Sequence, residues 1–225
     1  MIKYVLRSVH SIPYSYQKVQ ELLSPMEYNF WCHLGSDNRK REWFLGRAVA
    51  KSVLRSELIK IGFKDIPLNK VKILSSDNGR PIVDLLLRKT VNFNISLSLS
   101  HTSRFILFAY QFSSNGYLGV DVEKVREVDK DMISTFISED ELALIDLEGL
   151  DLDGFLFTSI WGLKESVLKA TGKGINSSMG MESISIRAID SAQREFELYE
   201  EEMGIFFKGR VLERDQHILS ICYSF

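Results

Sequence analysis

A faint internal repeat constrains the fold more than any other feature of this sequence. Residues 51–54 (KSVL) are matched by residues 165–168 (ESVL), 114 positions further along the chain. Both segments have helical periodicity, and each half of the chain later ends in an apolar run, RFILFAYQF and QHILSICYSF. The shared order and spacing predict two similar α+β halves. Chance similarity is the alternative, because the matched residues are few and common in protein cores.

The length of 225 residues allows one large domain or two smaller ones. We place the join in the polar, turn-forming sequence SSNG at residues 113–116. The expected domains are therefore an N-terminal α+β half, residues 1–114, and a C-terminal α+β half, residues 115–225. With 45% hydrophobic and 26% charged residues, the composition is that of an ordinary folded protein.

Charge and hydropathy exclude several classes of partner. The net charge of −2 gives no excess of positive charge for holding a long nucleic-acid backbone. The apolar run at residues 105–110 is far shorter than the ~20 residues of a membrane-spanning helix, and the N-terminus has no signal-peptide core. Cys32 and Cys222 stand outside any CxxC or zinc-type spacing. We expect a cytoplasmic protein that binds neither nucleic acid nor membrane, with two packed thiols.

Periodicity predicts both helices and strands in each half. A long helix is expected over residues 42–61, with Gly62 as its C-cap, and another over 155–170, stopped by Gly172 and Gly174. A shorter helix is expected over residues 139–148. The predicted strands are residues 71–75, 93–99, 104–112, 117–123, 182–189, 194–200, 204–213 and 216–224.

The strand over residues 117–123 carries two carboxylates on one face. In the sequence GVDVE, alternation places Asp121 and Glu123 side by side, roughly 6.5–7 Å apart at the backbone. Carboxylates at this separation can converge on a hard cation such as Mg²⁺. By itself, the D-x-E pattern is more often a solvated strand face.

The helix over residues 155–170 adds a third carboxylate beside lysines. Trp161, Glu165 and Lys169 are four residues apart and share one helix face, and Lys164 lies about 100° around the helix from Glu165. The alternative interpretation is a surface ion pair over a packed tryptophan.

Two further segments supply groups that bind phosphates. Ser100 and His101 end the strand in SLSLSHT, and Arg80 precedes a proline in the turn NGRP. Each segment alone is typical of an ordinary turn or strand end. Together with the carboxylates and lysines they form a set suited to holding a metal-bound diphosphate, which predicts phosphoryl transfer.

The order of these motifs, GRP, SLSHT, GVDVE and WGLKESVLKATGKG, resembles that of 4′-phosphopantetheinyl transferases of the larger, surfactin-synthetase-activating type. The resemblance begins at REWFLGRAVAKSVL and ends at Gly174. It implies a monomer of two pseudo-symmetric α+β halves with the active site in the cleft between them. Such enzymes transfer the phosphopantetheine arm of coenzyme A to a serine of an apo acyl or peptidyl carrier protein and release adenosine 3′,5′-bisphosphate. Their carriers serve fatty-acid, polyketide and nonribosomal-peptide synthesis.

The resemblance also implies roles for individual residues. The magnesium ligands would be Asp121, Glu123 and Glu165, and Glu165 would also be the base or water-holder for the incoming serine. Lys164 and Lys169 would contact phosphates, with Lys169 neutralising or protonating the leaving group. The coenzyme A nucleotide would be held by Arg80, Ser100 and His101, with Arg41 and Arg47 on the helix that lines the same cleft. Ser98 stands where many members have asparagine, so the role of that asparagine is in doubt.

Two rival functions are compatible with the same residues. A metal-dependent nuclease also uses carboxylates followed by glutamate and lysine, although the sequence lacks a basic stripe with interleaved aromatic residues. A non-catalytic module that binds coenzyme A or a carrier protein is the second rival. The presence of all four of Asp121, Glu123, Glu165 and Lys169 argues against that module.

Overall fold

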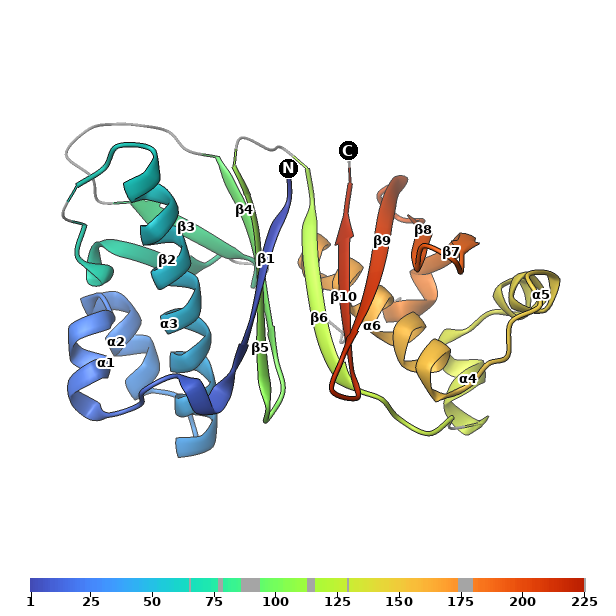
Figure 1. Ribbon diagram of the computed structural model, residues 1–225, viewed down its shortest axis with the longest axis horizontal. Helices are drawn as coiled ribbons and strands as arrows, with labels where there is room; N and C mark the ends of the chain where they lie inside the picture. The colour runs from blue at the N-terminus through green and yellow to red at the C-terminus, as the bar shows by residue number, and fades with distance from the viewer. Residues whose placement is uncertain are drawn as a thin grey trace.

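The computed structural model describes residues 1–64, 66–76, 79–85, 94–112, 116–128, 130–173 and 180–224. The fold is mixed α+β, as the sequence predicts. Two β-sheets face each other in the middle of the molecule, and long helices cover their outer sides (Figure 1). Residues 113–115 of the predicted join at 113–116 lie outside the described residues, so the domain boundaries stay a prediction.

The first sheet has the strand order β1-β5-β4 and is antiparallel throughout. Helix α3 packs on its outer side, and a separate hairpin of β2 and β3 lies nearby. The elements of this half are β1 (Lys3–Ser8), α1 (Tyr16–Leu22), α2 (Pro25–Cys32), α3 (Asp37–Lys60), β2 (Val71–Ser75), β3 (Pro81–Leu85), β4 (Ile95–His101), β5 (Phe105–Phe112) and the 3-10 turns Val9–Ser11 and Leu68–Lys70.

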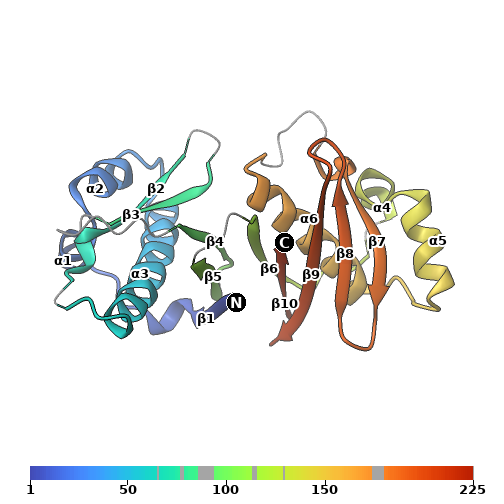
Figure 2. The same ribbon diagram turned by 90° about the horizontal axis from the view of Figure 1, so that it is seen from above.

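The second sheet has the strand order β6-β10-β9-β8-β7 and is also antiparallel. Helix α6 covers the side of this sheet that faces away from the first sheet (Figure 2). The elements of this half are β6 (Leu118–Lys124), α4 (Lys130–Phe136), α5 (Glu139–Leu147), α6 (Gly154–Thr171), the 3-10 turn Gly180–Ser183, β7 (Ile184–Asp190), β8 (Glu195–Glu200), β9 (Ile205–Arg214) and β10 (His217–Tyr223).

The two halves repeat the same pairing order. β1, β5 and β4 are neighbours in the order of β6, β10 and β9, and β2 pairs with β3 as β7 pairs with β8. The matched KSVL and ESVL segments lie in α3 and α6, the two helices that cover the sheets. The repeat in the sequence therefore corresponds to a repeat of topology.

Several elements differ from their predicted bounds. Helix α3 begins five residues earlier than predicted, because the side chain of Ser36 caps it by accepting from the amide of Arg39. Strand β4 begins at Ile95, and residue 93 lies outside the described residues. The short elements β1, α1, α2, β3 and α4 carry too few residues for a clear period and were not predicted. Cys222 is buried as expected, whereas Cys32 is exposed at the end of α2, which corrects the prediction of two packed thiols.

An apolar layer between the two sheets joins the halves. Strand alternation sends one face of β6 and β10 toward the first sheet and the other face toward α6. The buried members of this layer are Phe105, Leu107, Ala109, Leu118, Val120, Val122, Leu219 and Ile221. Among the helices in the described part of the chain, none is long and apolar enough to cross a membrane.

Gly119 allows β6 to lie directly against α6. A Cβ atom at this position would lie 1.7 Å from the carbonyl oxygen of Ser166 and 2.9 Å from the amide nitrogen of Ala170. We expect Gly119→Ala to push the strand from the helix and to lower the free energy of unfolding by at least ~1–3 kcal/mol. Urea unfolding tests this, with Gly35→Ala as the control because a Cβ there meets nothing within 4 Å in the described structure. Equal midpoints for the two variants would contradict the close approach.

Candidate active site

Strand β6 presents the two predicted carboxylates toward α6. Val120 and Val122 are buried in the layer between the sheets, so the alternate residues Asp121 and Glu123 take the other face. Asp121 is almost fully buried, and Glu123 is partly exposed and paired with the guanidinium of Arg126 at 2.8 Å. The prediction that Asp121 and Glu123 lie on the same face of the strand is confirmed, although only Asp121 is buried.

A three-residue hydrogen-bond group joins the two halves. The ammonium of Lys169 on α6 donates to Asp121 Oδ1 at 2.6 Å and to Ser100 Oγ at 3.0 Å. The Ser100 hydroxyl, from β4 of the first half, donates to the same Asp121 oxygen at 2.8 Å. Three segments far apart in the sequence therefore meet at one carboxylate oxygen.

Two buried carboxylate oxygens beside this group have no hydrogen-bond partner among the described residues. They are Asp121 Oδ2 and Glu165 Oε1. Burial raises the pKa of Glu165 to about 7; Lys169 opposes this shift, and Asp121 and Glu123 add to it. Because buried polar atoms are nearly always paired in proteins, two unpaired carboxylate oxygens at one place indicate a site for a cationic ligand.

The carboxylate oxygens of this site suit a hard divalent cation, but the side chains are not already arranged around one position. Within the described ranges, no three carboxylate, imidazole or thiol groups lie close enough together to hold a metal ion as the side chains stand. Asp121 is held by Lys169 and Ser100 through Oδ1, and Glu123 by Arg126. The free oxygens of Asp121 and Glu165 are nevertheless the oxygen ligands that Mg²⁺ takes.

A pocket of about 310 Å³ beside Lys169 gathers three positive side chains. Arg47 comes from α3, Arg80 from the turn before β3, and Lys169 from α6. Arg47 is buried, its Nε has no partner within the described chain, and its guanidinium stacks on Trp43 at 4.7 Å from the ring centre. Burial lowers the pKa of Arg47 to about 10, so the side chain stays charged at neutral pH. The pocket is suited to an anion with several negative oxygens.

Ser98, which stands where many transferases of this type have asparagine, lines the same pocket. Its hydroxyl accepts from the amide of Val120 at 3.1 Å and so ties β4 to β6 at the junction of the halves. Trp43, whose ring lies against the guanidinium of Arg47, is not predicted as a site residue from the sequence. An aromatic residue four positions before an arginine on a helix was the only available signal.

Of the other predicted residues, only His101 lies close to this site in the described part of the chain. His101 is the exposed last residue of β4, close enough to Lys169 and Asp121 for both charges to act on it. Arg41 does not line the described pocket. It lies near Tyr14 instead: burial raises the pKa of the Tyr14 hydroxyl, and the positive charge of Arg41 opposes that shift. Gly174 lies outside the described residues.

Lys164 is placed away from the other predicted residues. Its side chain is buried, and its ammonium donates to the carbonyl of Phe136 at 2.5 Å and to Glu141 at 2.9 Å. Lys164 lies about 100° around the helix from Glu165, so it is not on the face that Glu165 and Lys169 share. This placement does not fit the predicted phosphate contact, because partners within the protein already hold the ammonium.

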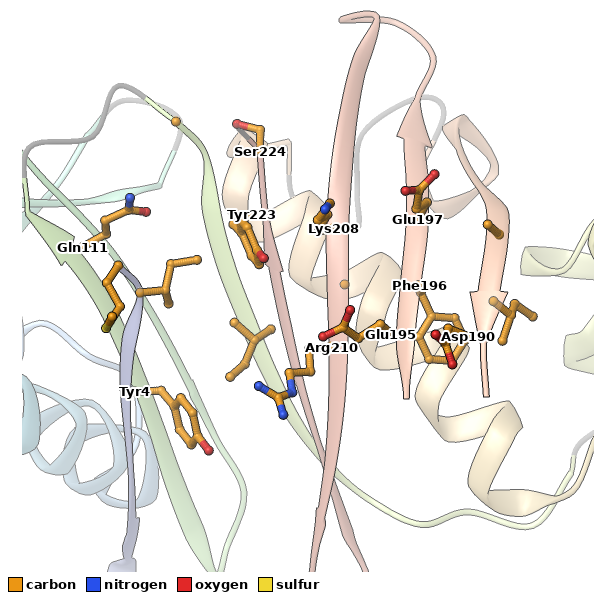
Figure 3. A pocket seen from close by; sticks show the side chains of 17 residues that line it. Tyr4, Gln111, Asp190, Glu195, Phe196, Glu197, Lys208, Arg210, Tyr223 and Ser224 are labelled. Atoms are coloured by element: carbon orange, nitrogen blue, oxygen red, sulfur yellow. The ribbon is translucent and has the colours of Figure 1, made fainter. Parts of the chain in front are cut away.

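A groove of about 960 Å³ lies elsewhere, between β1 and the face of β8, β9 and β10 that points away from α6. Figure 3 shows Tyr4 on one side and Lys208, Arg210 and Tyr223 on the other. None of the predicted site residues is among the described residues that line it. Size alone therefore does not identify the reactive site.

Comparison with known proteins finds a family model that covers the carboxylates and Lys169. The family model of the 4′-phosphopantetheinyl transferase superfamily matches residues 117–222, the segment from β6 to β10. This match covers a little under half of the chain. The match includes Asp121, Glu123, Glu165 and Lys169, and it supports the resemblance noted in the motifs.

Curated 4′-phosphopantetheinyl transferases extend the similarity beyond this segment. The chain is 28% identical to gsp of Aneurinibacillus migulanus over 127 residues, which cover 56% of this chain and 48% of that protein. It is 26% identical to psf-1 of Bacillus pumilus over 137 residues, 61% of this chain and 54% of that protein. It is 27% identical to ffp of Bacillus subtilis over 164 residues, 73% and 66% of the two chains. The chain thus spans about half to two thirds of the length of the transferases it matches.

Proposed function

We propose that this protein is a 4′-phosphopantetheinyl transferase that acts on carrier proteins. It moves the phosphopantetheine arm of coenzyme A to a serine hydroxyl of an apo acyl or peptidyl carrier protein, with Mg²⁺, and releases adenosine 3′,5′-bisphosphate. The observation that carries this proposal is the pair of buried oxygens of Asp121 and Glu165 beside Lys169, which have no hydrogen-bond partner among the described residues. The superfamily match over the same residues supports it.

The contacts suggest a role for each residue. Asp121 and Glu165 would hold Mg²⁺ through their free oxygens, with Glu123 as the third carboxylate; the bound cation would neutralise charge on the diphosphate. Glu165, whose pKa is raised to about 7 by burial, is suited to accept the proton of the incoming serine. Lys169 would neutralise the charge of the leaving phosphate, because its ammonium contacts Asp121 and its side chain also lines the basic pocket.

The basic pocket would hold the nucleotide end of coenzyme A. Arg80 lines it with its guanidinium over the ring of Tyr117, 5.1 Å from the ring centre, and Arg47 forms another part of the wall. Ser100 and His101 would lie at the boundary between this end and the reacting diphosphate. We expect the phosphate on the ribose to be recognised here, since two guanidinium groups match its oxygens.

Replacing Arg80 tests this assignment. We expect the unmodified protein to prefer coenzyme A over 3′-dephospho-coenzyme A, and Arg80→Ala to reduce that preference about tenfold or more, the loss of a charged hydrogen bond being worth ~1.5–3 kcal/mol. Calorimetric affinities for both compounds give the ratio, with Arg187→Ala as a control because Arg187 is exposed on β7. An unchanged ratio would place Arg80 outside the nucleotide site.

Intact mass measurement tests the function itself. The protein is incubated with coenzyme A, Mg²⁺ and a panel of apo carrier proteins, and a carrier serine should gain the mass of phosphopantetheine. Binding of coenzyme A without a mass gain would favour a non-catalytic module. Hydrolysis of added DNA with Mg²⁺ would favour the nuclease. The panel also identifies which carrier class is preferred, and sedimentation of the same sample tests the expected monomer.

A further inference from the structure

In the described residues, each half of the chain contains a buried lysine–glutamate pair of the same design. In the first half, Glu27 is the third residue of α2 and forms a reciprocal capping box with Ser24. The other oxygen of Glu27 accepts from the amide of Ile73 on β2 at 3.0 Å. Lys51 on α3 donates to Glu27 at 2.5 Å and to the carbonyl of Leu22 at 2.9 Å. One carboxylate thus ties α2, α3 and β2 together.

The second half repeats this arrangement group by group. Glu141 is the third residue of α5 and forms a capping box with Ser138, and its other oxygen accepts from the amide of Ile186 on β7 at 2.8 Å. Lys164 on α6 donates to Glu141 at 2.9 Å and to the carbonyl of Phe136 at 2.5 Å. Both lysines are buried, with exposed fractions of 0% for Lys51 and 2% for Lys164.

The two pairs differ in the residue that comes after the lysine on its helix. Lys164 is followed directly by Glu165, and Lys169 lies on the same helix, whereas Lys51 is followed by Ser52. Adjacent helix residues point about 100° apart, so an anchor on Lys164 determines where Glu165 points. Lys169 anchors the other side of α6 to Asp121. Figure 2 shows α5 and β7, the elements tied by Glu141, on the far side of α6 from β6.

We propose that the Lys164–Glu141 pair is a positioning device that sets the rotation and depth of α6, and with them the placement of Glu165 and Lys169 against Asp121. Any other placement of α6 would leave a buried charge without its partner, which is unfavourable. The first-half pair does the same for a helix without a carboxylate at the reactive site. This inference rests on the proposed transfer for its effect on rate, and it assigns Lys164 a role other than phosphate binding.

The duplicated pair provides a matched control within the same chain. The test variant is Lys164→Met with Glu141→Gln, and the control is Lys51→Met with Glu27→Gln; each removes both charges of one pair. We expect the test variant to lower kcat at least about tenfold, since a misplacement of ~1 Å can cost about a hundredfold, with KM and Kd for coenzyme A changed less than about twofold. The control should lose a similar amount of Tm and keep kcat at saturating coenzyme A within about twofold. Any effect of the control on transfer should fall on coenzyme A affinity, because Arg47 lies four residues before Lys51 on α3 and lines the basic pocket.

Two results would overturn the proposal. An equal loss of kcat in both double variants would mean that each pair only supports the fold. A tenfold weaker affinity for coenzyme A with unchanged kcat would make Lys164 a phosphate contact after all. If a double variant does not fold, Lys164→Arg and Lys51→Arg carry the same comparison, because they keep the pair charged while enlarging the buried head group.

A second readout separates this proposal from the proposed function. If the unmodified protein transfers nothing to any carrier, the proposed function fails, and amide hydrogen exchange then decides the positioning role. Faster exchange at residues 165–169 in the second-half variant alone would support it. Unchanged exchange there would overturn it.

Discussion

Asp121→Asn should reduce transfer at saturating coenzyme A at least about a hundredfold, because changing even the groups that orient a metal ligand typically costs ~10–100-fold. Asp121 is the acceptor for both Lys169 and Ser100, and its second oxygen is buried without a partner among the described residues. Asparagine keeps the size and one oxygen but removes the charge. The variant should therefore lose both the cation and the anchor of Lys169.

A Mg²⁺ titration of the transfer rate, combined with thermal melting, measures this effect. Asp146→Asn, which changes an exposed aspartate on α5, is the matched control and should transfer normally. We expect Asp121→Asn to remain folded, because Lys169 is partly exposed and can turn toward water. Near-normal transfer at ordinary Mg²⁺ concentrations would remove Asp121 from the metal site.

Glu165→Gln should lower the transfer rate about 10²–10⁴-fold, the usual range for loss of a general base, and should change coenzyme A affinity much less. The same substitution should stabilise the protein at alkaline pH. Burial raises the pKa of Glu165 from 4.5 in the unfolded chain to about 7 in the folded protein. Between these values the unfolded chain has released its proton while the folded protein keeps it, so folding stability falls as pH rises through this window.

The stabilising effect has a definite size and sign. The gain in unfolding free energy from Glu165→Gln should be about 2–3 kcal/mol larger at pH 8 than at pH 5. Urea unfolding at both pH values, with a chelator present, measures the difference, and Glu148→Gln on the exposed end of α5 is the control. A gain that does not depend on pH would show that Glu165 is not an ionised, desolvated carboxylate, and a transfer rate within about threefold of the unmodified protein would exclude it as the base.

Periodicity and motif order gave much of this fold and site in advance. The long helices, most strands of both sheets and the shared face of Asp121 and Glu123 follow from alternation and helical spacing, which are local properties. The 114-residue offset between KSVL and ESVL predicted the repeat that the pairing order of the strands displays. The superfamily match confirms the resemblance carried by GVDVE and the helix motif.

Other features depend on contacts between distant segments, and only the tertiary structure decides them. Ser100 and Lys169 are 69 residues apart and meet at Asp121 because β4, at the edge of the first sheet, lies beside β6, at the edge of the second. Spacing along α6 placed Lys164 about 100° from Glu165, but it could not say that α5 and β7 would bury that side. The sequence by itself therefore determined which side chains share a strand or a helix face. The tertiary structure decided which of those faces meet, because burial and charge pairing depend on the surfaces that pack against them.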